Sequence, residues 1–155
     1  MRTVLVAVDG SACAGQAIAE IVKMTLQAGP MNLHLINVQP RIFAEESLIF
    51  GDISRMDKHY YEAGGKALAP SEQALKAANI TFTSHRGIGP IAQTIIAKAA
   101  ELNADAIVMG THGHGRLAGL LLGSVSNKVL HLSPVPVTLV RGDAPVDFGG
   151  RLGAV

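Results

Sequence analysis

The chain has 155 residues, of which 48% are hydrophobic and 16% are charged. This length is typical of one domain, and this composition indicates a well-buried core, so an intrinsically disordered chain is excluded. The 13 lysine and arginine residues exceed the 12 aspartate and glutamate residues by only one. Because a near-neutral chain lacks the positive charge that attracts nucleic-acid phosphates or an anionic membrane surface, we expect neither nucleic acid nor membrane among its partners.

Several features predict a cytoplasmic protein. No apolar run approaches the roughly 20 residues that cross a bilayer. The apolar start of the chain ends at Asp9, which is too early for the core of a signal peptide. Cys13 is the only cysteine, so the chain cannot form an intrachain disulfide.

The first third of the chain alternates between strand and helix patterns. Residues 3–8 form a continuous β-branched run, which is typical of a strand covered on both faces. Ser11 is a plausible N-cap for a helix whose apolar residues recur at helical spacing until Gly29 and Pro30. Residues 33–38 then predict a second strand.

The middle of the chain is less regular. Residues 39–56 read as a loop, with a short helical turn near 44–50. A helix is predicted over residues 57–78, but Gly64, Gly65 and Pro70 lie inside it. Because glycine and proline are poor helix formers, we expect a break in this helix.

The rest of the chain continues the alternation. The pattern predicts a strand at 80–85, a helix from Pro90 to Leu102, a strand at 106–109, a helix at 124–132 and a strand at 135–140. Such alternation is typical of parallel βαβ units, so the fold class is α/β, a three-layer sandwich with a five-stranded parallel sheet. We expect one domain over residues 1–141 and a flexible tail over residues 142–155.

A glycine-rich segment joins the fourth strand to the last helix. Glycines let main-chain amides approach a ligand closely, and the N-terminus of a helix favours an anion. Arg116 adds a positive charge, and Ser124 and Ser126 add hydroxyl donors. We therefore predict phosphate binding by Gly113, His114, Gly115, Arg116, Ser124, Val125 and Ser126. The alternative is a glycine-rich connection that only lets the helix pack closely.

The segment has the spacing Gly110-x-x-Gly113, nine residues, then Gly123-Ser124. Together with an N-terminal Val-Ala-Val-Asp-Gly-Ser and a closing Pro-Val-Pro-Val-Thr-Leu-Val-Arg, it resembles the universal stress protein family over about residues 2–141. The resemblance implies sheet order 3-2-1-4-5, an adenine nucleotide alpha hydrolase-like fold, and usually a homodimer. It also implies that the motif glycines and Ser124 hold phosphates, that Asp9 approaches the ribose and metal, and that the main chain of Val38 meets adenine. Because every motif glycine is present, the resemblance favours the ATP-binding branch.

Some candidate residues have more than one interpretation. Asp9 lies after the first strand, where it caps the next helix, binds Mg²⁺ or Mn²⁺ beside the phosphates, or does both. His112 and His114 are weaker candidates for a metal pair or a general base. Cys13 lies in the first turn of a helix, where a redox role competes with that of a small packed side chain.

These observations lead to three functional hypotheses. The first is a nucleotide-dependent regulatory module in the stress response, which binds ATP with Mg²⁺ or Mn²⁺ and associates as a homodimer through the last strand. The second is an enzyme, at most a weak ATPase or an adenylyl-transfer relative. The third is a scaffold dimer that works without nucleotide.

Overall fold

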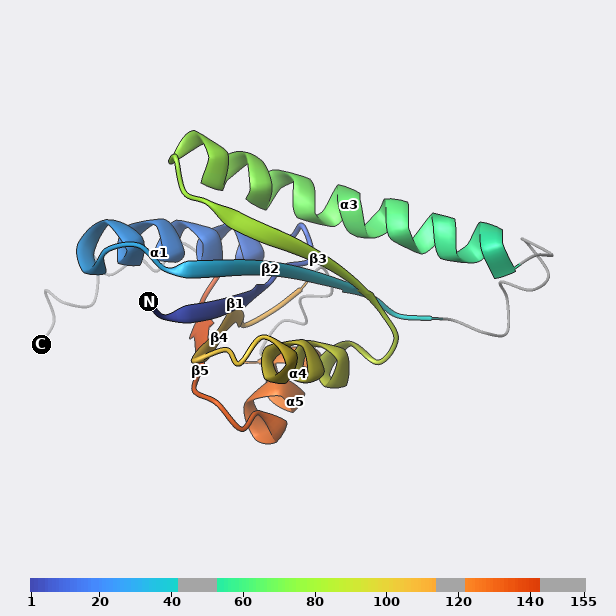
Figure 1. Cartoon of the computed structure of the whole chain (residues 1–155). Coiled ribbons are helices and arrows are strands. Elements are labelled where there is room, and N and C mark those ends of the chain that lie inside the picture. Colours follow the sequence, from blue (N-terminus) through green and yellow to red (C-terminus); the bar gives the residue numbers. More distant parts are fainter. Residues whose placement is uncertain (42–52, 114–121, 143–155) are drawn as a thin grey trace, which may run out of the picture.

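The computed structural model describes residues 1–41, 53–113 and 122–142. In these ranges five parallel strands form one sheet in the order β3-β2-β1-β4-β5 (Figure 1). The strands are β1 (Thr3–Ala7), β2 (Asn32–Gln39), β3 (Phe82–Ile88), β4 (Ala106–Gly110) and β5 (Val137–Val140). The helices are α1 (Ala12–Ala28), α3 (Ile53–Ala77), α4 (Ile91–Glu101) and α5 (Ser124–Leu132).

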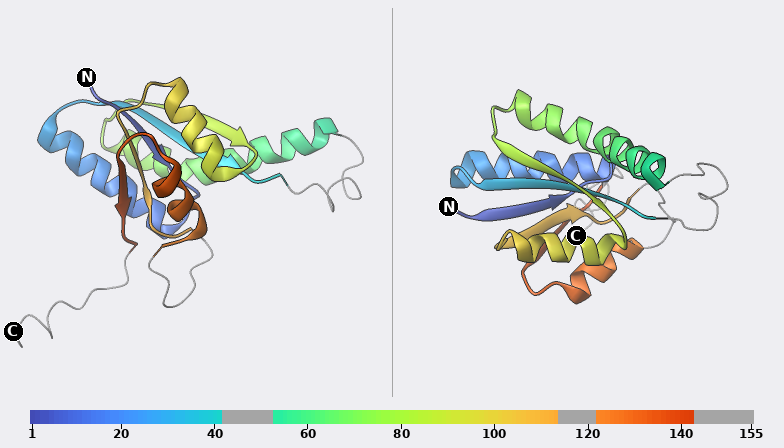
Figure 2. Two further views of the ribbon diagram at one scale, coloured as in Figure 1. Left: turned by 90° about the horizontal axis from the view of Figure 1, so that it is seen from below. Right: turned by 45° about the vertical axis from the view of Figure 1, so that its right-hand side comes forward.

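The helices cover both faces of the sheet. α1 and α3 lie on one face, and α4 and α5 lie on the other (Figures 1 and 2). Because successive side chains of a strand point to opposite faces, Val4 and Val6 pack under α1 and α3, whereas Leu5 and Ala7 pack under α4 and α5. The predicted three-layer α/β fold and the strand order 3-2-1-4-5 are confirmed.

The helix after β1 has the predicted caps. The Ser11 hydroxyl accepts a hydrogen bond from the Ala14 N–H at 3.2 Å. At the other end, Gly29 adopts a φ of 92° and donates its N–H to the Thr25 carbonyl. A left-handed residue of this kind ends a helix with little strain only when it is glycine.

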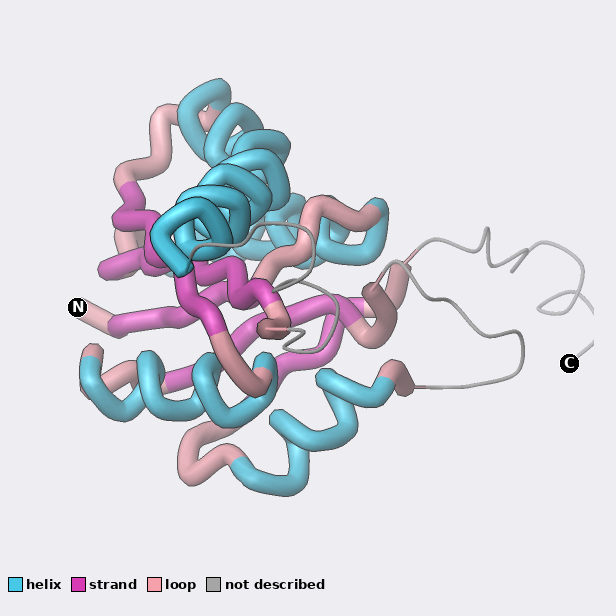
Figure 3. Tube along the Cα trace, turned by 90° about the vertical axis from the view of Figure 1, so that its right-hand side faces the viewer, coloured by secondary structure: helices cyan, strands magenta, loops and turns pink. Residues whose placement is uncertain are grey.

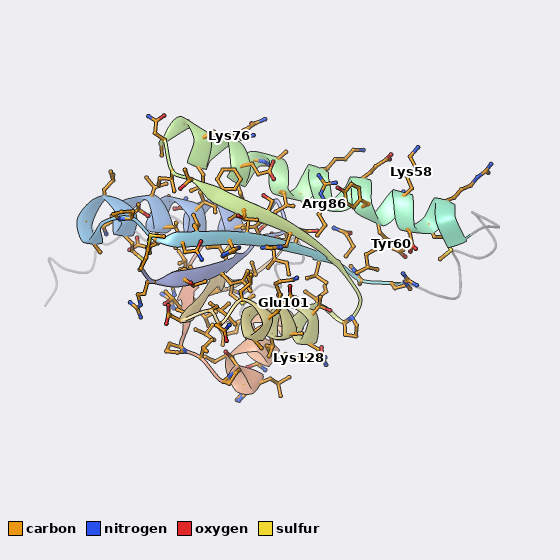
Figure 4. All side chains as sticks on the ribbon, in the orientation of Figure 1. Lys58, Tyr60, Lys76, Arg86, Glu101 and Lys128 are labelled. Carbon is orange, nitrogen blue, oxygen red and sulfur yellow. The ribbon has the colours of Figure 1, made fainter. Side chains whose placement is uncertain are left out.

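The predicted break in the helix around Gly64, Gly65 and Pro70 is wrong, because α3 runs without interruption from Ile53 to Ala77. A Cβ on Gly65 would lie 2.9 Å from a guanidinium nitrogen of Arg86, so the glycines make room for this side chain (Figure 4). The guanidinium carbon lies 4.0 Å from the centroid of the Tyr61 ring, and Nη1 donates to the Tyr61 carbonyl at 3.1 Å. These contacts hold the glycine pair in a helical conformation despite its low propensity.

Pro70 is tolerated because the helix is anchored on both sides of it. Leu68 and Leu75 are fully buried against the sheet. The cost of the main-chain hydrogen bond that proline cannot donate is offset by this burial. The helical turn expected near 44–50 lies outside the described residues, as does the tail beyond residue 142.

The third strand lies further along the chain than predicted, at 82–88 rather than 80–85. Asn79 has a φ of 55°, and the Ile80 N–H donates to the Leu75 carbonyl, so these residues close α3. At the other end, residues 86–88 continue to pair with residues 37–39 of β2. β5 likewise starts later than predicted, at Val137.

A pair of histidines joins β2 and β3 on the face that α4 covers. His34 Nδ1 and His85 Nε2 are 3.0 Å apart, and the rings are stacked. Burial lowers the pKa of both imidazoles, and the nearby Lys98 ammonium lowers it further. Glu101, which bonds Lys98 at 2.7 Å, acts in the opposite direction on the pKa of His85.

The carboxyl ends of the strands meet at one edge of the molecule, between the two helix layers (Figure 3). β2 and β3 extend beyond the end of β1 there, because residues 37–39 pair with β3 but have no partner in β1. None of the helices in the described ranges combines the length and apolar character needed to cross a bilayer.

Candidate functional site

A cavity of about 280 Å³ opens at the carboxyl edge of the sheet. This volume is near the lower end of the range for small-molecule sites. Eight of the predicted site residues line it: Asp9, Val38, Gly110, Gly113, Gly123, Ser124, Val125 and Ser126. His114, Gly115 and Arg116 lie outside the described residues.

One end of the cavity is apolar. Ile36 and Met109 contribute from β2 and β4, and Ile91 and Ile95 contribute from α4. The i, i+4 spacing of the two α4 isoleucines does not reveal this role in the sequence, because a buried core residue and a residue at a cavity wall have the same spacing. None of these four side chains carries a charge, and such an apolar lining suits an aromatic ring.

The main chain of Val38 faces this apolar end. The last rung between β1 and β2 is the bond from the Val8 N–H to the Ile36 carbonyl, at 2.9 Å. The Gly89 N–H donates to the Gln39 carbonyl, so Gln39 bonds toward β3. Because main-chain groups alternate in direction along a strand, those of Val38 point to the other side, where β1 has already ended.

Asp9 lies at the cavity wall, against Gly113 of the glycine segment. Its Oδ1 accepts from the Ser11 N–H at 3.0 Å, so Ser11 rather than Asp9 is the N-cap of α1. A Cβ on Gly113 would lie 2.5 Å from the Asp9 Oδ2. Any side chain at position 113 would therefore displace the carboxylate from its place at the cavity wall.

The two ends of the glycine segment are joined by hydrogen bonds. The Thr111 carbonyl accepts from the Gly123 N–H at 2.7 Å and from the Ser126 hydroxyl at 2.7 Å. The same hydroxyl lies 3.0 Å from the Gly123 carbonyl. Ser126 is 2% exposed, and its hydroxyl proton is donated to a main-chain carbonyl. In this arrangement its oxygen can only accept a hydrogen bond from a ligand.

The start of α5 borders the cavity without a side-chain cap. The N-cap residue is Gly123, which has no side chain to bond the first amides of the helix. Ser124 is exposed and opens the helix at the cavity wall. Uncapped amides at a helix N-terminus carry a partial positive charge and bind anions.

Close packing against Cys13 requires a glycine at position 110. A Cβ at this position would lie 2.6 Å from the Cys13 sulfur. The Cys13 thiol is buried and donates to the Val140 carbonyl at 3.3 Å. Cys13 is thus a small packed side chain between α1 and the ends of β4 and β5.

His112 lines the cavity, and its Nδ1 lies 3.0 Å from the Thr111 hydroxyl. No group of three histidine, cysteine or carboxylate side chains gathers to hold a metal in the part of the chain that the structure describes. A cation at this edge would therefore combine Asp9 with oxygen atoms of a bound ligand.

Comparison with known proteins agrees with the fold and the motif. The model of the universal stress protein family matches residues 1–141. A universal stress protein of Thermus aquaticus is 35% identical over 147 residues, which are 90% of this chain and 98% of that protein. A universal stress protein family protein of Arabidopsis thaliana, solved with AMP bound, has a TM-score of 0.69 at 18% identity and covers 95% of this chain and 97% of its own. A universal stress protein solved in complex with cAMP has a TM-score of 0.64 at 24% identity and covers 92% of this chain and 98% of its own. The chain therefore belongs to the universal stress protein family.

Proposed function

We propose that the cavity binds an adenine nucleotide, ATP with Mg²⁺ or Mn²⁺, and that the protein is a nucleotide-dependent regulatory module in the stress response. The observation that carries the proposal is that one cavity combines apolar side chains, a carboxylate and the start of a helix without a side-chain cap. The apolar end and the main chain of Val38 suit a purine, the Asp9 carboxylate suits a sugar hydroxyl or a cation, and the start of α5, which has no side-chain cap, suits phosphates. The AMP and cAMP complexes of proteins with the same fold support this choice of ligand.

The residues present fit a cation that arrives with the nucleotide. Mg²⁺ in proteins takes one or two carboxylates and completes its shell with phosphate oxygens and water. Asp9 offers one carboxylate at the cavity wall, and its Oδ2 faces Gly113 across the glycine segment. Bound there, the cation would neutralise phosphate charge while the chain holds the base and the sugar.

Calorimetry with purified protein, stripped of any nucleotide that co-purifies, tests the proposal. ATP, ADP, AMP and cAMP are titrated into the wild type and into Gly113→Ala. We expect Gly113→Ala to weaken binding, because its Cβ displaces the Asp9 carboxylate. Gly15→Ala is the matched control, since a Cβ there meets no atom within 4 Å. No heat with any of the four nucleotides at millimolar concentration would refute the proposal.

Slow ATP hydrolysis is a second candidate, favoured by the position of His112 at the cavity wall. A general base must reach the attacking water, and the His112 imidazole is the one basic side chain among the described residues that line the cavity. Single-turnover phosphate release from the wild type and from His112→Ala tests this role. Equal rates would remove His112 from any hydrolytic step.

We also propose that two copies associate through β5. This strand is at the edge of the sheet, and Leu130 and Leu132 of the preceding helix are exposed beside it. An edge strand offers unpaired main-chain groups to another chain, and exposed leucines add apolar surface. Light scattering after size exclusion should give twice the mass of the chain, and a monomer at micromolar concentration would contradict the proposal.

A further inference from the structure

Asn37 is a buried polar residue beside the apolar end of the cavity. It is 3% exposed, and its Nδ2 donates to the Val8 carbonyl at 2.8 Å. Its Oδ1 accepts from Gln39 Nε2 at 2.7 Å. The orientation of the amide follows from its partners, because a carbonyl only accepts and the Gln39 amide nitrogen only donates. A side chain of β2 therefore bonds the main chain that follows β1.

The Val8 carbonyl is the acceptor that the next rung of the sheet would use. Ala7 is paired with Ile36, so a continuing parallel ladder would bring the Val38 N–H onto the Val8 carbonyl. In the described part of the chain, no main-chain hydrogen bond joins Val38 to Val8. The Asn37 side chain takes that acceptor instead, and the Val38 N–H is left at the cavity.

We propose that Asn37 is a positioning residue for base recognition. By occupying the Val8 carbonyl, it prevents the Val38 N–H from closing the ladder and keeps this donor directed at the ring nitrogen N1 of a bound adenine. The inference rests on the proposed function, since it describes how the same cavity recognises the adenine base. Gln39 holds the Asn37 amide in the required orientation, and Gly64 of α3 lies over it, since a Cβ there would be in ordinary contact with the Asn37 Oδ1 at 3.5 Å.

The first experiment needs no nucleotide. Hydrogen exchange of the Val38 amide is followed by NMR in the wild type, in Asn37→Leu and in Asn32→Leu. Asn32 is a matched control, because its side chain also bonds from β2 toward β1, to the Thr3 hydroxyl at 3.2 Å, but at the opposite end of the strand. Leucine at position 37 leaves the Val8 carbonyl without its partner, and an unpaired buried acceptor is costly, so the Val38 N–H should move onto it.

The expected result is that the Val38 amide exchanges readily in the nucleotide-free wild type and in Asn32→Leu, and about tenfold or more slowly in Asn37→Leu. A Val38 amide that is equally protected in all three proteins would overturn the inference. The measurement reports a main-chain hydrogen bond, which a general loss of packing would weaken rather than strengthen.

The second experiment tests which atoms of the base the protein recognises. Affinities are measured for ATP, for 1-deaza-ATP, which has a C–H in place of N1, and for purine riboside triphosphate, which lacks the 6-amino group. The wild type and Asn32→Leu should prefer ATP over 1-deaza-ATP by several-fold to about tenfold, the usual effect of one hydrogen bond. Asn37→Leu should lose this preference but keep its preference for the 6-amino group, because the Val38 carbonyl is unchanged.

Two results would overturn the inference. One is that Asn37→Leu lowers the affinity for all three nucleotides by the same factor, as a structural role alone would do. The other applies if Asn37→Leu does not fold, in which case the wild type decides: ATP should protect the Val38 amide and 1-deaza-ATP should not, so equal protection by both refutes it. A wild type that binds none of the three refutes the proposed function instead, and the exchange rates without nucleotide still show whether Asn37 holds the donor open.

Discussion

Replacing Ser126 with alanine removes a hydroxyl that joins the two ends of the glycine segment. The size of the loss in unfolding free energy depends on whether the carbonyls that accept from this hydroxyl keep another hydrogen bond. The Thr111 carbonyl retains the Gly123 N–H at 2.7 Å, and the Gly123 carbonyl retains the Asn127 N–H at 3.0 Å, so no buried acceptor is left unpaired. The cost is therefore the net value of one hydrogen bond, about 1 kcal/mol in the free energy of unfolding, rather than the ~3 kcal/mol of an orphaned group.

Urea unfolding and nucleotide titration together check this prediction. With an m-value of roughly 1 to 3 kcal/mol/M, the midpoint of Ser126→Ala should fall by about 0.3 to 1 M, and its affinity ratio for ATP over AMP should stay that of the wild type. Ser124→Ala is the matched control, since Ser124 is exposed at the start of α5 and should affect the ratio without changing the midpoint. If Ser126→Ala keeps its midpoint and selectively loses affinity for ATP, the hydroxyl donates to a phosphate and the reasoning is refuted.

Two further predictions concern stability. The pKa values of His34 and His85 are lowered in the folded protein, mainly by burial, so the unfolded state binds protons near the usual imidazole pKa of 6.5 at a pH where the folded state does not. Stability should therefore be full above that pH and fall below it, and His85→Gln should flatten this dependence; parallel curves for variant and wild type would contradict it. Gly15→Ala should raise the unfolding free energy by about 0.5 to 1 kcal/mol, because helix propensity improves in open space. Gly65→Ala should gain less or lose stability, because its Cβ meets the Arg86 guanidinium at 2.9 Å, and an equal gain would show that this contact costs nothing.

The fold could be predicted from the sequence because its main signals are local. β1 and β4 contain apolar runs of four residues, β2 and β5 are rich in apolar residues, and the helices have apolar faces, so the alternation of strands and helices is visible without tertiary information. The continuity of α3 could not be predicted, because it depends on Arg86, which lies about 20 residues after the glycine pair and packs against it only once β3 is in place. The charge of Arg86 and the glycine after it also made β3 appear to end too early, although an edge strand tolerates both.

The residues of the site also differ in whether the sequence pattern alone reveals them. The motif glycines and Asp9 are visible as a pattern, whereas the place of Val38 followed only from family resemblance. Asn37 was visible as a polar residue within an apolar strand, which is a signal of a specific partner when the strand is buried. Its partner, the Val8 carbonyl, lies just after β1 and 29 positions earlier in the chain, and sequence patterns carry no information on such a bond.

The glycines of the motif have two separate reasons to be glycine, and only one of them concerns a ligand. Side chains at positions 110 and 113 would collide with Cys13 and Asp9, so close packing at the edge of the sheet already requires these glycines. Their presence therefore agrees equally with a scaffold that binds no nucleotide. What close packing does not require is a start of α5 without a side-chain cap and a rung left open at Val38, because both leave main-chain donors at a cavity wall with no partner among the described residues. Such donors are costly unless water or a ligand satisfies them, so they, more than the glycines, separate a binding site from a tight connection.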